Sequence, residues 1–221
     1  SFPNPNPKKG RVESMYFLSK EGKKQILENE FLSESEIIKM PRSKTMAYKD
    51  YFHRKFTIDF QIKLDHWANK NGKTVPFFDT YFDKTGNNRT NKNLRAKTRI
   101  DFNDEMFFIP DGAFKIDNQF YLFEMYNGKD TKRVLEQLDK HAQALTYRHT
   151  HKTYNLDPNK SYKTILLFEF LSAKNALLKR IQDEKSFDFI RPYFLVKANE
   201  ELHQGEFSTW RNLNDEEKPI I

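Results

Sequence analysis

The sequence predicts an α/β protein in which helices flank a mixed central sheet. A stripe of apolar side chains, recurring every three or four residues, indicates a long helix from about residue 45 to 69. Segments 111–116 and 119–126 indicate two strands joined by the turn residues Asp117-Asn118. The nearly continuous apolar run 162–170 is typical of a strand inside a sheet. Strands and helices in this order are expected to pack as one sheet covered by helices.

The N-terminal region is expected to lie outside that core. Residues 1–10 contain three prolines and two asparagines, which favours a flexible tail. Residues 11–44 form an N-terminal extension, with a strand over 11–19, a short helix from Ser19 to Glu28 and a capping-box pattern at Ser33 and Glu36. The chain begins with Ser rather than Met, so we expect that an N-terminal domain is missing.

Residues 45–211 are predicted to form the α/β domain. After the long helix we expect a strand over 75–82, an exposed loop over 84–100, the strand pair, a helix over about 131–148, the strand 162–170, a helix capped by Ser172, and a strand over 193–196. Residues 212–221 are polar and are predicted to form a second flexible tail.

The composition excludes several classes of protein. The 221 residues include no cysteine, so a disulfide scaffold, a thiolate nucleophile and a cysteine-ligated metal are excluded. No apolar run reaches the roughly 20 residues of a membrane span, and no signal peptide is visible, so we expect a cytoplasmic protein. Lys and Arg number 38 against 31 Asp and Glu, and the net charge of +7 favours an anionic partner, with nucleic acid first.

A pair of acidic residues is the main candidate for chemistry. If Asp117-Asn118 is a two-residue hairpin turn, Ile116 faces Gln119, and the same register places Asp111 directly opposite Glu124. Two carboxylates so close repel each other unless a cation lies between them. A hard divalent ion, Mg²⁺ or Mn²⁺, fits such oxygen ligands and can activate water at a phosphate.

Two further residues are expected near the pair. Tyr126 lies two positions after Glu124 and should share its face, where it would position a substrate or act as a nucleophile. Lys129 follows and would stabilise charge on a phosphate. The alternative is an ordinary strand end that faces water. The apolar run 120–123 argues against it, because a carboxylate after a buried strand is costly without a partner.

These residues carry a family resemblance. Ile109-Pro110-Asp111 followed by Phe123-Glu124-Met125-Tyr126 resembles the nuclease core written PD-(D/E)XK, and the helix-strand-strand-strand-helix-strand order matches that core. The segment 16–22, His53, Pro110-Asp111 and Glu124 followed by Gly128, Asp130 and Thr131 resemble the replication-relaxation family of plasmid proteins. That family is similar to the C-type mobilisation relaxases, which nick plasmid DNA at a transfer origin.

The resemblance implies roles for particular residues. Asp111 and Glu124 would bind the metal, and Gln137 stands where some of these nucleases place a glutamine. Tyr126 occupies the position where these nucleases usually have a lysine. Three alternatives follow: Lys129 takes over the role of that lysine, Tyr126 has a different role, or the site is inactive. His53 and Asp59 would contribute from the long helix, although His53 also suits a packing role. The extension 11–44 would be a remnant of a winged helix.

A run of cations is the candidate DNA contact. The loop contains six basic residues and no acid, so we expect it to bind the phosphate backbone, although a solvated loop is the alternative. These residues are Lys84, Arg89, Lys92, Arg95, Lys97 and Arg99.

Together, these expectations describe a metal-dependent, relaxase-like DNA nickase of plasmid mobilisation or replication, acting on duplex or partly single-stranded origin DNA. Other mobilisation or replication proteins are possible partners. The alternative is a non-catalytic DNA-binding protein of the same fold, and a protein-interaction domain with incidental carboxylates is a third reading. The sequence does not define the oligomeric state.

Overall fold

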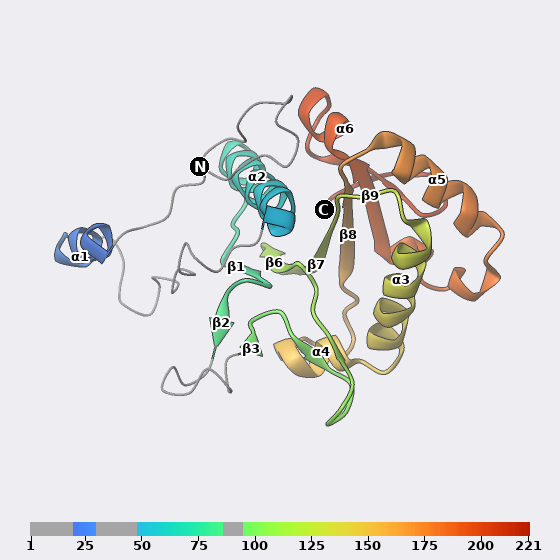
Figure 1. Cartoon of the computed structure of the whole chain (residues 1–221), viewed down its shortest axis with the longest axis horizontal. Coiled ribbons are helices and arrows are strands. Elements are labelled where there is room, and N and C mark those ends of the chain that lie inside the picture. The colour runs from blue at the N-terminus through green and yellow to red at the C-terminus, as the bar shows by residue number, and fades with distance from the viewer. Residues whose placement is uncertain (1–19, 30–47, 86–94) are drawn as a thin grey trace.

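The computed structural model describes residues 20–29, 48–85 and 95–221 (Figure 1). The predicted tail 1–10, the strand 11–19, the Ser33–Glu36 capping box and the cations Arg89 and Lys92 lie outside the described residues. The short helix of the extension is confirmed as α1, Lys20–Glu28.

The described residues form a mixed α/β fold around a seven-stranded sheet of order β1-β6-β7-β8-β9-β10-β11. The strands are β1 (Phe78–Thr80), β6 (Gly112–Ile116), β7 (Gln119–Tyr126), β8 (Lys163–Phe168), β9 (Phe194–Ala198), β10 (Thr209–Asn212) and β11 (Glu217–Pro219). Strands β7, β8 and β9 are parallel, and the other neighbours are antiparallel. The predicted mixed sheet with flanking helices is confirmed.

Helices and small hairpins surround this sheet. The helices are α2 (Tyr48–Lys70), α3 (Thr131–Thr146), α4 (His149–Tyr154), α5 (Leu171–Gln182) and α6 (Asn199–Gln204), with single 3₁₀ turns at η4 (Lys185–Phe187) and η5 (Arg191–Tyr193). Strand β2 (Lys84–Thr85) pairs with β3 (Arg95–Ala96), and β4 (Ile100–Asp101) pairs with β5 (Phe107–Phe108).

The two faces of the sheet are covered by different helices. Phe60 and Leu64 of α2 pack in one buried cluster with Phe123 of β7. Leu138 of α3 and Leu177 of α5 pack in another cluster, which includes Tyr126 from the opposite face of β7. Alternate residues of a strand point to opposite faces, so Glu124, two positions before Tyr126, faces α3.

Several boundaries differ from the sequence expectations. Strand β1 is shorter than 75–82, and the stretch 84–100 contains β2, β3 and the start of β4. Helix α5 begins after Phe170 as its N-cap, so the predicted cap at Ser172 is wrong. Helices α4 and α6 were not predicted.

The expected C-terminal tail is part of the sheet. Strand β11 pairs with β10, and Ile220 is buried in the cluster that also holds Trp210. The Tyr121 hydroxyl donates a 2.5 Å hydrogen bond to the backbone carbonyl of Ile220. The prediction of a flexible tail over 212–221 is therefore wrong, and the α/β domain extends to the end of the printed sequence.

Candidate functional site

The β6–β7 hairpin brings Asp111 and Glu124 together. Its register pairs Ile116 with Gln119 and Gly112 with Phe123, as the two-residue turn predicts, and the next position places Asp111 opposite Glu124. Asp117 in the turn has a positive φ of 51°, which aspartate tolerates. The Asp111 Oδ2 accepts a 2.8 Å hydrogen bond from the Met125 backbone N–H. The predicted juxtaposition of the two acids is confirmed.

Burial and mutual repulsion make this pair unusual. Glu124 is 2% exposed. Burial raises its pKa well above the ordinary value, and the neighbouring Asp111 raises it further through its charge and through the hydrogen bond that only a protonated Glu124 could share with it. A carboxyl group in such a position is stable as a neutral acid or beside a cation.

Each carboxylate is paired with a histidine from a different helix. The Nε2 of His53, on α2, lies 2.8 Å from Asp111 Oδ1, and the Nε2 of His141, on α3, lies 2.7 Å from Glu124 Oε1. Burial lowers the pKa of His53, but the hydrogen bond and charge of Asp111 outweigh it, so the net pKa is raised. Burial lowers the pKa of His141 to about 3, so this imidazole is neutral at pH 7.

Several buried polar atoms near the pair have no hydrogen-bond partner among the described residues. They are Glu124 Oε2, Tyr126 Oη, Gln137 Oε1 and His141 Nδ1. A buried polar group without a partner typically costs about 1–3 kcal/mol, and native proteins rarely accumulate such groups. Four such atoms therefore lie around one carboxylate pair.

A small cavity of about 90 Å³ opens beside these groups. It is lined by His53 from α2, Asp111 before β6, Tyr126 at the end of β7, and Arg133 and Gln137 from α3. The first turn of α3 is fixed there by Asp130, whose side chain accepts hydrogen bonds from the backbone N–H groups of residues 132 and 133. Helix α2, the β6–β7 hairpin and helix α3 thus contribute polar side chains to one small space.

Tyr126 shares the face of Glu124, as predicted, but its surroundings do not suit a nucleophile. The side chain is 7% exposed, and its ring stacks on Phe168 with centroids 5.0 Å apart. Burial raises the pKa of the hydroxyl well above its usual value, and the charges of Glu124 and Asp111 raise it further. A phenolate is therefore strongly disfavoured at this position, whereas a hydroxyl that donates a hydrogen bond is favoured.

Two site residues were missed by sequence reasoning, although the sequence carries a signal for them. Arg133 lies four positions before Gln137 and His141 lies four positions after it, so all three lie on one stripe of α3. The positive charge of Arg133 opposes the net rise in the pKa of His53, Glu124 and Tyr126, so the guanidinium acts on the whole cluster. A polar stripe on an otherwise apolar helix face is the pattern that indicates these residues.

Two predicted site residues interact elsewhere. The Lys129 ammonium lies 5.5 Å from the centroid of the Phe170 ring, and Lys129 does not line the cavity. Asp59 of α2 pairs with Lys55 at 2.8 Å rather than with the carboxylate cluster. Among the candidates from the long helix, only His53 reaches the Asp111–Glu124 pair in the described structure.

The predicted DNA-contacting cations are partly neutralised by acids from outside their run. Lys97 pairs with Asp79 at 2.7 Å, and Asp101 pairs with Arg99 at 2.5 Å and Arg95 at 3.7 Å. Lys84 donates to the Tyr81 carbonyl at 3.2 Å. The run 84–100 contains no acid in the sequence, but acids from neighbouring segments pair with three of its cations in the structure.

The described part of the chain contains no cluster of three or more His, Asp or Glu side chains arranged to hold a metal ion. Within the same ranges, no helix has the length and apolar character needed to cross a membrane. Comparisons with protein-family models, with curated proteins and with solved structures found no significant match.

Proposed function

We propose that this protein is a metal-dependent DNA endonuclease that nicks one strand, in the manner of the relaxase-like plasmid proteins that its sequence resembles. The observation that carries the proposal is the Asp111–Glu124 pair, in which a buried Glu124 Oε2 has no partner among the described residues and lies next to a second carboxylate. Such a pair requires a proton or a cation, and a divalent cation also supplies nuclease chemistry.

The order of elements supports the proposal. Helix α2, strands β1, β6 and β7, helix α3 and strand β8 follow one another in the order of the PD-(D/E)XK core, apart from the small hairpins between β1 and β6 and the short helix α4 between α3 and β8. Strand β6 runs antiparallel to both neighbours, and β7 is parallel to β8. Asp111, immediately before β6, and Glu124, near the end of β7, are the two acids to which this resemblance assigns metal binding.

The donor set fits a hard divalent cation. Asp111, the free Oε2 of Glu124 and the free amide oxygen of Gln137 are oxygen ligands of the kind that Mg²⁺ and Mn²⁺ prefer. We propose that Asp111 and Glu124 hold the ion, with Gln137 close by. Once bound, the ion supplies charge stabilisation at a phosphate and activation of water.

The remaining groups act on the substrate and on the acids themselves. His141 holds Glu124 Oε1 and so leaves Oε2 for the ligand, while His53 fixes Asp111. Arg133, rather than Lys129, supplies the positive charge that faces a phosphate in the cavity. The Tyr126 hydroxyl serves as a hydrogen-bond donor, because its raised pKa keeps it protonated.

A second candidate is a non-catalytic DNA-binding protein with the same fold. The observation that favours it is that both carboxylates already have an imidazole partner, at 2.8 and 2.7 Å. Lysine is absent from the described lining of the cavity. In that case the cations of β2, β3 and the adjoining turn would bind DNA, and the carboxylate pair would be a remnant.

Nicking of supercoiled plasmid in Mn²⁺ distinguishes the two functions. The proposal predicts conversion to the open-circular form by the full chain, and loss of that activity in Asp111→Asn and Glu124→Gln. Exposed acids of the same chemical types, in Asp157→Asn and Glu217→Gln, provide matched controls that keep the activity. DNA binding without nicking by the unaltered protein would support the second candidate instead.

A further inference from the structure

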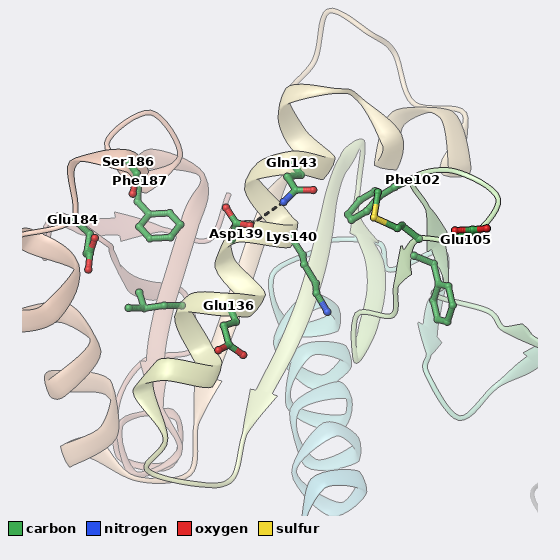
Figure 2. Close-up of a pocket in the computed structure, with 12 residues that line it drawn as sticks. Phe102, Glu105, Glu136, Asp139, Lys140, Gln143, Glu184, Ser186 and Phe187 are labelled. Atoms are coloured by element: carbon green, nitrogen blue, oxygen red, sulfur yellow. Dashed lines mark hydrogen bonds between the residues drawn. The ribbon is translucent and has the colours of Figure 1, made fainter.

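A second hollow, of about 750 Å³, lies apart from the carboxylate site and shares none of its lining residues. Figure 2 shows that side chains of α3 form its middle, with the segment around Phe187 on one side and the segment from Phe102 to Glu105 on the other. The hollow is therefore a groove bounded by the β4–β5 hairpin, α3 and η4.

Exposed apolar side chains line one edge of the groove. Met106 is 55% exposed and Phe107 is 42% exposed, and both line it. Leu135, which is half-buried, and Phe187, which is largely buried, also line the groove. An exposed apolar patch that is rimmed by polar residues often marks a site where another protein binds.

The charge of the groove is opposite to that of the whole protein. Its described lining contains the acids Glu105, Glu136, Asp139 and Glu184 but only one cation, Lys140. The whole chain, in contrast, has an excess of Lys and Arg and a net charge of +7. Nucleic acid is repelled by such a lining, whereas a cationic segment is attracted.

One edge of the groove already accommodates a cation on an aromatic ring. The guanidinium carbon of Arg99 lies 3.6 Å from the centroid of Phe107. The ring remains 42% exposed, so further surface is left for a partner. An arginine from another molecule can therefore make the same kind of cation–π contact with this ring.

We propose that this groove binds a short cationic segment of a partner protein, in which arginines alternate with apolar side chains. The apolar residues contact Met106 and Phe107, and the arginines pair with Glu136, Asp139 and Glu184. This inference does not depend on the nuclease proposal, since the two sites share no described lining residue. It assigns nucleic acid and protein to different surfaces of the chain.

The test uses the full chain and a fluorescein-labelled peptide of about ten residues that alternates arginine and leucine. Fluorescence anisotropy at about 150 mM salt, where long-range attraction is screened, measures the affinity. The double variant Glu136→Lys/Asp139→Lys is expected to weaken binding at least about ten-fold. Glu200→Lys/Glu217→Lys makes the same charge change at exposed positions outside the groove, and binding should stay within about two-fold.

The apolar half of the proposal is tested separately. Met106→Ser removes an exposed side chain and is expected to weaken peptide binding about three-fold without changing the melting temperature. Hydrogen exchange should show protection by the peptide in segments 103–108 and 136–143. Equal loss of affinity in both charge-reversed pairs would overturn the proposal.

Two other occupants give distinct results that would also overturn it. If these segments are protected by a DNA duplex instead of the peptide, the groove binds nucleic acid. If sedimentation shows a dimer of the peptide-free chain that Met106→Ser dissociates, the groove binds a second copy.

Discussion

Asp111 and Glu124 face each other one register step beyond the Gly112–Phe123 pair of the β6–β7 hairpin, and a histidine holds each of them from a different helix. The arrangement places two acidic groups side by side in a largely buried position. Glu124 Oε2 in particular has no partner among the described residues. Stability and function are therefore expected to conflict at this position.

Replacement of Glu124 by glutamine should stabilise the protein in the absence of divalent ions. The amide keeps the shape, can accept the hydrogen bond from His141 and removes a carboxyl group whose pKa is raised by burial and by Asp111. We expect the free energy of unfolding in urea with EDTA to rise by about 1 kcal/mol. Glu217→Gln, an exposed control, should change it by less than about 0.5 kcal/mol. A clear loss of stability in Glu124→Gln would contradict this account.

The His53–Asp111 pair should make stability depend on pH. The folded pKa of His53 is raised above the ordinary 6.5, because Asp111 outweighs the effect of burial. The stabilisation is therefore complete below the unfolded pKa and is lost as the pH rises through the folded pKa. The loss of stability caused by His53→Gln should be larger at about pH 6 than at about pH 9. If the loss of stability caused by His53→Gln were the same at both pH values, the charged imidazolium would contribute nothing to the stability of the fold.

His141 should act by positioning Glu124. The variant His141→Phe leaves Glu124 Oε1 without its buried partner and should cost about 2–4 kcal/mol in urea unfolding. It should also weaken Mn²⁺ binding, measured by titration calorimetry, at least about ten-fold. His141→Gln can restore a donor near Nε2 and should recover much of the Mn²⁺ affinity. Equal affinities in the phenylalanine and glutamine variants would assign His141 a packing role alone.

The variant Tyr126→Phe should keep its nicking activity within about ten-fold of the unaltered chain. Any covalent protein–DNA adduct that the unaltered chain forms should form to the same extent in this variant. The hydroxyl is buried without a described partner, and its raised pKa disfavours the nucleophilic phenolate. Denaturing gels of nicked plasmid with radiolabelled DNA report any adduct. An adduct that forms with Tyr126 and disappears in Tyr126→Phe would identify this residue as the nucleophile and overturn our assignment.

The hairpin and its acids were predictable because local rules determine them. The turn chemistry of Asp117-Asn118 sets the register of β6 against β7, and counting outward from the turn reaches Asp111 and Glu124. The long helix was predictable from its apolar stripe, which ends in the structure at Lys70. In each case one short segment contains all the information.

The rest of the site depends on contacts between distant segments. Arg133 lines the cavity and His141 contacts Glu124 only because α3 packs over the face of β7 that presents Glu124, and no local rule fixes that packing. Asp79 and Asp101 neutralise cations that look unopposed in the sequence. The C-terminal strand was missed because its anchors, Trp210, Leu213 and Ile220, are separated by polar residues and gain their burial only against the sheet.

Anomalous diffraction from crystals of the full chain soaked in Mn²⁺ tests the central proposal most directly. The account predicts one strong peak within about 2.5 Å of both an Asp111 oxygen and Glu124 Oε2, and no such peak in Glu124→Gln crystals. Density that shows both histidine contacts intact, with no peak between the two acids at saturating Mn²⁺, would contradict the metal site and leave only the DNA-binding function.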